Sequence, residues 1–207
     1  VQTLQPAAAG TGRMIFAMDA TMSRQPTWDL ALGLQSEMFR AVKEVGGLDV
    51  QLIYFRGFGE CRSSRWVRDP DALARLMRQV HCEGGHTQIR KVLSHARKET
   101  ERQTVNALVY VGDCMEESID DLSQLAGELG LVGVPIFVFQ EGHDAGAEKA
   151  FKEIARLSRG AYCRFDAGSA EQLRALLKAV AVYATGGRKA LQNAKSDAAT
   201  LLLEQLR

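Results

Sequence analysis

Short apolar runs separated by longer amphipathic segments make up most of this chain. The runs are too short for helix cores and predict strands buried on both faces of a sheet. They are 13–19, 48–56, 105–113, 134–140 and 161–166. The segment 60–69 follows 48–56 after a few glycine-rich residues, and so short a link indicates an antiparallel hairpin partner.

Between these runs, apolar residues recur at helical spacing. One helix is expected to open at Pro26 and to run from Trp28 to Val45, where Gly46 and Gly47 stop it, because proline suits a first helical turn and glycine suits a helix end. The other expected helices are 69–80, 88–99, 118–130, 147–160, 169–184 and 188–207.

Strands that alternate with helices predict one fold class. We expect an α/β fold, doubly wound, with a mainly parallel sheet, one antiparallel edge strand and helices on both faces. The expected organisation is an N-terminal extension over 1–12, the α/β domain over 13–184 and a C-terminal helix over 185–207. The apolar face of this last helix either packs on the domain, where it would cap the sheet edge, or receives a partner helix. That face comprises Leu191, Ala194, Ala198, Leu201, Leu202 and Leu206.

Composition narrows the possible partners. The chain has 207 residues, of which 46% are hydrophobic and 25% charged, and its net charge is +1. This balance lacks the basic stripe that nucleic-acid binding needs. No apolar stretch has the length of a membrane span, and residues 1–12 lack the regions of a signal peptide. We expect neither a nucleic acid nor a membrane as partner.

The cysteine pattern indicates whether the protein works in a reducing or an oxidising compartment. Cys61, Cys82, Cys114 and Cys163 form no CxxC pair, and three of them lie in or beside apolar runs. Free cysteine behaves as a small hydrophobic residue. The pattern favours four reduced thiols and a cytoplasmic protein over two disulfides.

Oxygen-bearing side chains gather at the predicted carboxyl ends of the strands. Asp19 ends the first strand, Thr21 and Ser23 follow at alternate positions, Asp113 ends the strand 105–113, and Thr87 precedes a helix. Sites in open parallel sheets form beyond these ends, so we expect the five to meet. Hard divalent cations prefer such oxygen ligands. Taken singly, these residues also suit turns and caps, and Ser23 is placed to cap the helix that Pro26 opens.

These motifs resemble a known family. D-x-T-x-S at 19–23, G-G-x-T at 84–87 and the aspartate at 113 are similar to the metal-ion-dependent adhesion site (MIDAS) of von Willebrand factor A (VWA) domains. Thr21 stands where the family usually has serine and keeps the hydroxyl. The resemblance covers roughly 13–184, because "VPIFVFQEG" and "EIARLSRGAYCRF" are similar to the family's later strand and its helix-strand end.

The resemblance implies a non-enzymatic, metal-dependent protein-binding module. Hydroxyls would hold Mg²⁺ (or Mn²⁺ or Ca²⁺) directly, carboxylates would act largely through water, and a partner's glutamate or aspartate would fill the open position. Besides Thr21, this sequence departs from the family at three positions. Gly112 and Cys114 flank Asp113 where threonine and glycine are common, and Met22 separates Thr21 from Ser23 where small residues are common.

Two other functions remain open. The first is a metal-dependent hydrolase or thiol enzyme on the same rim, with His86 as the obvious base and Cys114 as the nucleophile. The second is a scaffold subunit with a vestigial metal site that binds through the C-terminal helix. A structural zinc site at His81, Cys82 and His86 is disfavoured, since no fourth ligand has suitable spacing.

Overall fold

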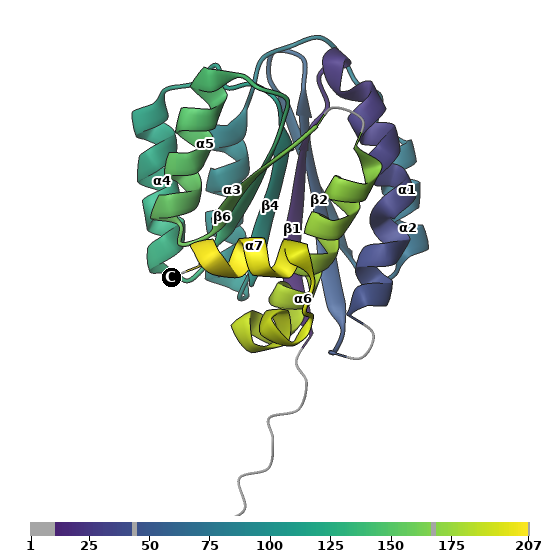
Figure 1. Ribbon diagram of the computed structural model, residues 1–207. Coiled ribbons are helices and arrows are strands. Elements are labelled where there is room, and N and C mark those ends of the chain that lie inside the picture. The colour runs from purple at the N-terminus through teal and green to yellow at the C-terminus, as the bar shows by residue number, and fades with distance from the viewer. Residues whose placement is uncertain (1–10, 43–44, 167–168, 207) are drawn as a thin grey trace, which may run out of the picture.

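The computed structural model describes residues 11–42, 45–166 and 169–206 (Figure 1). Most of the predicted extension over 1–12 lies outside these residues. The strands are β1 Gly12–Asp19, β2 Leu48–Arg56, β3 Glu60–Val67, β4 Ala107–Gly112, β5 Ile136–Glu141 and β6 Ala161–Phe165. The helices are the 3-10 turn η1 Met22–Arg24, then α1 Gln25–Ala41, α2 Pro70–Arg78, α3 Ile89–Arg102, α4 Ile119–Leu131, α5 Ala145–Leu157, α6 Ala170–Asn193 and α7 Asp197–Gln205.

The strands form one sheet in the order β3-β2-β1-β4-β5-β6. All neighbouring pairs are parallel except β2 and β3, which form an antiparallel hairpin at the edge. The predicted α/β class and the antiparallel edge strand are therefore confirmed. β1 lies between β2 and β4, and the chain winds outward from it in both directions. In this topology the strand order reverses between β1 and β4.

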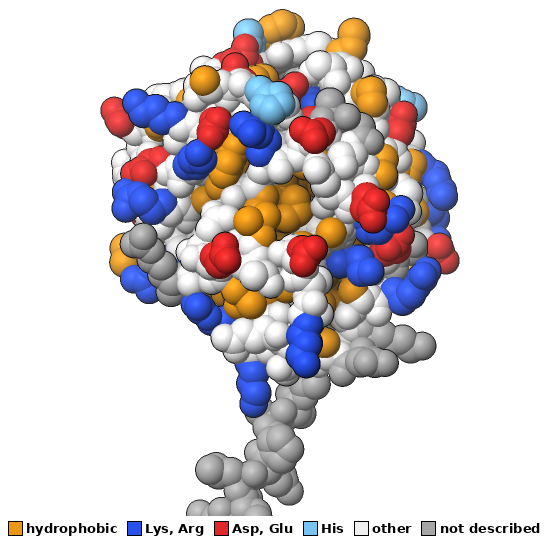
Figure 2. All heavy atoms as spheres, viewed as in Figure 1, with side chains coloured by type: hydrophobic (Ala, Val, Ile, Leu, Met, Phe, Trp, Pro, Cys, Tyr) orange, Lys and Arg blue, Asp and Glu red, His pale blue; other side chains and the backbone are white. Residues whose placement is uncertain are grey.

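Helices cover both faces of the sheet. Helices α1, α2, α6 and α7 pack on one face, and α3, α4 and α5 pack on the other (Figure 1). Alternate residues of β1 serve the two cores: Phe16 joins the first and Ile15 the second, and both are fully buried. In Figure 2, hydrophobic side chains line a hollow beside α6 and α7. No helix among the described residues is long and apolar enough to cross a bilayer.

The start and end of α1 differ from the expectation. The helix begins at Gln25 after the 3-10 turn, and its N-cap is Arg24 without a side-chain hydrogen bond. Ser23 is therefore not its cap, and that expectation is wrong. The helix ends at Ala41 with Val42 as C-cap, so its expected extension to Val45 is wrong as well. Part of that extension, residues 43–44, lies outside the described residues.

The single helix expected over 188–207 is also wrong. Helix α6 continues to Asn193 across a kink at Gly187, where φ is 65°. Lys195 then adopts a left-handed φ of 47°, which ends the helix. The Ser196 hydroxyl accepts a hydrogen bond from the Ala199 N–H at 3.1 Å and so caps α7. A serine cap following the break is the local signal that divides the segment.

The apolar face of this C-terminal segment packs within the domain. Leu191, Ala198, Leu202 and Leu206 are buried, whereas Ala194 is exposed and Leu201 is 44% exposed. Gln205 on α7 also covers the outer strand of the sheet. Its side-chain oxygen accepts from the Tyr162 N–H and its amide donates to the Tyr162 carbonyl, both at 2.9 Å. The Gln205 side chain therefore hydrogen-bonds to backbone groups that an edge strand otherwise leaves unpaired.

Candidate metal centre

The candidate site lies at the point where the strand order reverses. β1 ends at Asp19, and Asp113 directly follows Gly112, the last residue of β4. The two strands are parallel neighbours, so their carboxyl ends meet at the upper edge of the sheet in Figure 1. Open α/β sheets bind ligands in the crevice at such a point.

Asp19 is a buried carboxylate with one free oxygen. The residue is 1% exposed. Its Oδ1 accepts a hydrogen bond from the Thr21 N–H at 2.7 Å, while its Oδ2 is buried and has no hydrogen-bond partner among the residues that the structure describes. Burial raises the pKa of Asp19 to about 6; the charge of Asp113 adds to the rise, and Thr21 and Arg24 oppose it. Ionising this group is costly unless a cation compensates.

Asp113 brings a second carboxylate to the same place. Its Oδ2 lies 3.5 Å from the Ser23 hydroxyl, which donates to it, and 3.5 Å from Nη1 of Arg24. Its Oδ1 is buried and finds no hydrogen-bond partner in the described part of the chain. Four of the predicted residues, Asp19, Thr21, Ser23 and Asp113, therefore come together in one cluster.

Thr87 joins this cluster through the loop that follows β4. Its hydroxyl accepts a hydrogen bond from the Glu116 N–H at 3.0 Å, and its own N–H donates to Glu116 Oε2 at 3.0 Å. Among the described residues, these bonds go to Glu116 and not to Asp19 or Asp113. The structure thus places Thr87 beside the loop that begins with Asp113, without a hydrogen bond to either carboxylate.

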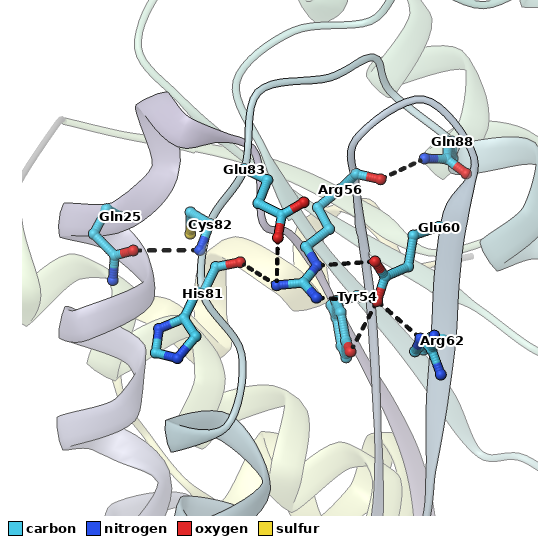
Figure 3. Close-up of polar contacts among 9 residues, drawn as sticks. All are labelled: Gln25, Tyr54, Arg56, Glu60, Arg62, His81, Cys82, Glu83 and Gln88. Carbon is cyan, nitrogen blue, oxygen red and sulfur yellow. Dashed lines mark hydrogen bonds and ion pairs between the residues drawn. The ribbon is translucent and has the colours of Figure 1, made fainter.

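Arg56, the last residue of β2, holds the loop between α2 and α3 (Figure 3). Its guanidinium donates to the His81 carbonyl at 2.7 Å and lies 3.3 Å from Glu83 Oε1. Its own carbonyl accepts from the Gln88 side chain at 3.1 Å. Glu60, across the hairpin, fixes the same guanidinium at 3.1 Å. Both ends of this loop are therefore tied to the end of β2.

Arg24 and Glu141 form a buried ion pair beside the cluster, and the sequence analysis missed both. They are 4% and 6% exposed. The guanidinium contacts the Glu141 carboxylate as well as Asp113, and the Thr27 hydroxyl also donates to Glu141. Glu141 is the last residue of β5, so the rule that selected Asp19 also applies to it. No sequence signal marks Arg24.

Tyr110 explains why glycine precedes Asp113. A Cβ at position 112 would lie 2.4 Å from the Tyr110 hydroxyl, because alternate residues of a strand share one face. Tyr110 is 1% exposed, and its hydroxyl has no hydrogen-bond partner in the described part of the chain. A threonine at 112, as the family commonly has, would collide with this ring.

Cys114 completes a group that can hold an ion. One potential ligand atom from each of Asp19, Asp113 and Cys114 lies within 4.8 Å of the other two. Of the histidine, cysteine, aspartate and glutamate residues that the structure describes, no other three meet this condition. A zinc site at His81, Cys82 and His86 is therefore not assembled.

The donor set fits a divalent cation. Within the described ranges, two buried carboxylate oxygens lack hydrogen-bond partners, and the hydroxyls of Thr21 and Ser23 lie next to these carboxylates. With Glu141, the region holds three carboxylates against the guanidinium of Arg24, so negative charge is in excess. A bound cation would offset that excess and satisfy the free oxygens.

Comparison with known proteins identifies the fold. No protein-family model matches the sequence, and no curated protein is found to be similar to it. The structure, however, has the fold of VWA domains. It is similar to an aerotolerance-related membrane protein from Bacteroides fragilis NCTC 9343, with a TM-score of 0.62 and 18% identity over 80% of this chain and 95% of that chain.

Two further structures share this fold. The SpRpn10 VWA domain matches with a TM-score of 0.58 and 12% identity, over 76% of this chain and 89% of that chain. Proximal thread matrix protein 1 from the mussel byssus, with a zinc-occupied MIDAS motif, matches with a TM-score of 0.64 and 16% identity over 84% of this chain and 45% of that chain. The VWA resemblance of the sequence is thus confirmed at the level of the fold.

Proposed function

We propose that this protein is a divalent-metal-dependent protein-binding module and not an enzyme. Asp19, Thr21, Ser23, Thr87 and Asp113 would hold Mg²⁺, Mn²⁺ or Ca²⁺ at the rim of the sheet. A bound ion supplies positive charge and an open coordination position that a partner's aspartate or glutamate can fill. The observation that carries the proposal is the pair of buried, unpartnered oxygens, Asp19 Oδ2 and Asp113 Oδ1.

The surrounding residues hold these two carboxylates in place. The Thr21 N–H fixes one oxygen of Asp19 and leaves the other free. Arg24 contacts Asp113 and, through Glu141, links it to the end of β5. Side chains supported in this way form a preorganised site, which loses little conformational freedom when a ligand binds.

The rim around the carboxylates has the character of a protein interface. Phe58, at the tip of the β2–β3 hairpin, is 84% exposed and packs edge-on against His86, with ring centroids 5.1 Å apart. Met22 is 68% exposed between the two candidate hydroxyl ligands. Along the upper edge of Figure 2, histidine, acidic and hydrophobic side chains lie together. Exposed apolar groups around a polar centre favour a protein partner.

The enzymatic alternative has less support. A thiol nucleophile needs a lowered pKa, but burial, followed by the charge of Asp113, raises the pKa of Cys114 to about 12. His86 turns its Nδ1 to Glu116 at 3.1 Å. The MIDAS motif of the mussel protein holds zinc, which also supports metal binding on this fold.

The proposal is tested first on the metal. We expect titration calorimetry to detect one divalent ion per chain in the wild type and none in Asp19→Ala, with circular dichroism unchanged. Glu101→Ala serves as the control, because this exposed carboxylate lies in the last turn of α3, at the opposite end of that helix from Thr87. Equal metal binding by the wild type and Asp19→Ala would contradict the proposal.

Partner recognition is tested with a random peptide library. Peptides that bind in the presence of metal and are released by chelator are expected to share an aspartate or glutamate. Replacing that residue by its amide should abolish binding, and Asp19→Ala should not select the peptides. Peptides captured equally well in chelator would contradict a metal-bridged mode of binding.

A further inference from the structure

Cys114 lies close to the carboxylates of Asp19 and Asp113. The ligand atoms of Asp19, Asp113 and Cys114 are within 4.8 Å of one another. We infer that Cys114 is itself a metal ligand and that the site therefore selects Zn²⁺ over Mg²⁺. This inference rests on the proposed function, because it names the ion of the same site; it adds Cys114 to the ligands and assigns the hydroxyls to outer positions.

The spacing suits a single tetrahedral ion. Zinc binds sulfur at about 2.3 Å and carboxylate oxygen at about 2.0–2.2 Å, so ligand atoms on one ion lie about 3.3–3.6 Å apart. The ligand atoms here are at most 4.8 Å apart. Small side-chain rotations would bring them to the distances that zinc requires. Two oxygens and one sulfur leave the fourth position of the tetrahedron for the partner's carboxylate or for water.

The hydrogen-bond pattern favours this ligand set over the hydroxyls. Ser23 donates to Asp113, and the Thr87 hydroxyl accepts from the Glu116 N–H. Two of the three hydroxyls therefore have protein partners. The atoms without partners belong to the carboxylates: Oδ2 of the almost fully buried Asp19 and Oδ1 of Asp113. An ion bound between these two carboxylates lies beside the sulfur of Cys114.

Sulfur in the ligand set decides which ion is preferred. Mg²⁺ demands oxygen ligands in near-octahedral geometry, whereas Zn²⁺ accepts mixed oxygen and sulfur ligands in a tetrahedron. When zinc binds, the Cys114 S–H bond breaks, its electron pair goes to the ion and the proton is released to solvent. The surrounding hydroxyls then orient the carboxylates as outer partners.

The experiment uses Co²⁺ as a spectroscopic substitute for Zn²⁺. We expect Co²⁺ to give the wild type a near-ultraviolet sulfur-to-cobalt charge-transfer band that added Zn²⁺ removes. Cys114→Ser should lose the band and bind Zn²⁺ at least about 100-fold more weakly, since even outer partners cost about 10- to 100-fold. Its Mg²⁺ affinity should stay within a factor of a few.

Cys82→Ser is the matched control. Cys82 is partly buried, and the charge of Asp19 contributes to the rise of its pKa to about 11, so it lies near the site without belonging to the ligand group. The control should keep the band. Its loss in Cys82→Ser, or a wild type that binds metal without any band, would overturn the inference and leave the proposed function standing. Absence of all divalent binding in the wild type would overturn both.

Folding of the variants is checked independently. Serine differs from cysteine by one atom, and thermal unfolding of metal-free Cys114→Ser should match that of the wild type. Cys114→Ala provides a second variant, which should also lose the band and the Zn²⁺ preference. If both variants fold and both retain a wild-type Zn²⁺ affinity, the sulfur is not a ligand and the inference fails.

Discussion

Two carboxylate clusters lie at the same edge of the sheet, and they satisfy their charges differently. In the first, at the end of β2, Glu60 accepts hydrogen bonds from Arg56 and Arg62, and these interactions lower its pKa. In the second, at the ends of β1 and β4, Asp19 and Asp113 each keep a buried oxygen that no described residue pairs with. Burial raises the pKa of Asp19 to about 6. The first cluster is complete within the chain and the second is not.

The difference indicates which cluster serves function. A carboxylate neutralised by arginines has no remaining affinity to offer a ligand. Buried polar atoms almost always have partners in folded proteins, so a pair of free carboxylate oxygens calls for an explanation. A site that binds a cation keeps its ligands available at a cost in stability when the ion is absent. The predictions below test this contrast.

The largest effect is expected at Arg24. This buried guanidinium is the cation that the second cluster already contains, and Arg24→Met leaves Glu141 buried without its partner. Breaking a buried ion pair costs about 3–5 kcal/mol. We expect a loss of this size in the free energy of unfolding, measured by urea denaturation. Arg24→Met combined with Glu141→Gln should recover most of it; a double variant as unstable as the single one would show that the pair is not responsible.

The second prediction is an increase in the free energy of unfolding, on replacing Asp19. Above pH 6, Asp19 is ionised in the folded protein against the cost of burial, and a pKa of about 6 in place of 3.8 corresponds to about 3 kcal/mol. Asp19→Asn should therefore raise the free energy of unfolding of the metal-free protein at pH 8 by up to about 3 kcal/mol. A saturating ion should stabilise the wild type, by about 2.7 kcal/mol at 100 times Kd, but not the variant.

The same pKa gives a pH trend. Because the folded state binds the proton more tightly than the unfolded state, the Asp19 contribution lowers the stability of metal-free protein as pH rises from about 4 to about 6. The contribution then stays constant above that range. The difference in the free energy of unfolding between the wild type and Asp19→Asn, measured at each pH, separates the Asp19 contribution from that of the other titrating groups. A difference that does not change between pH 4 and pH 7 would contradict the raised pKa.

Much of the fold could be predicted, because each buried strand appears as a continuous apolar run. The acids at the ends of two such runs, Asp19 and Asp113, also indicated where the candidate site lies, because the structure brings them together. The sequence could not show that Arg24 turns inward, since its neighbours in η1 give no periodicity that separates buried from exposed positions. Nor did it show the break near Lys195, where a left-handed residue and a serine cap outweigh the helical spacing of the leucines.

Replacing a glycine beside each cluster by alanine tests how tightly the two clusters are packed. Gly112→Ala places a Cβ 2.4 Å from the Tyr110 hydroxyl beneath Asp113, whereas a Cβ at Gly59, in the hairpin next to Glu60, meets nothing within 4 Å. Overpacking a rigid core costs about 1–3 kcal/mol. We expect that loss for Gly112→Ala and less than about 0.5 kcal/mol for Gly59→Ala, measured by thermal unfolding. Equal losses would mean that Tyr110 moves away without cost.

The smallest effect on stability is expected at Arg56, and it separates support of the site from support of the fold. Arg56→Ala removes partly exposed pairs that are worth about 1 kcal/mol or less, so unfolding should hardly change. The variant also releases His81 and Glu83 in the loop that carries Thr87. The affinity for a divalent ion should therefore fall. The loss should be smaller than the roughly 10- to 100-fold that follows when a residue bonded directly to a metal ligand is replaced. Arg62→Ala is the matched control, because Arg62 binds the same Glu60 without contacting that loop (Figure 3). If both variants lower the divalent-ion affinity equally, Glu60 acts on the site through its charge. If neither variant lowers it, the loop keeps its position without Arg56.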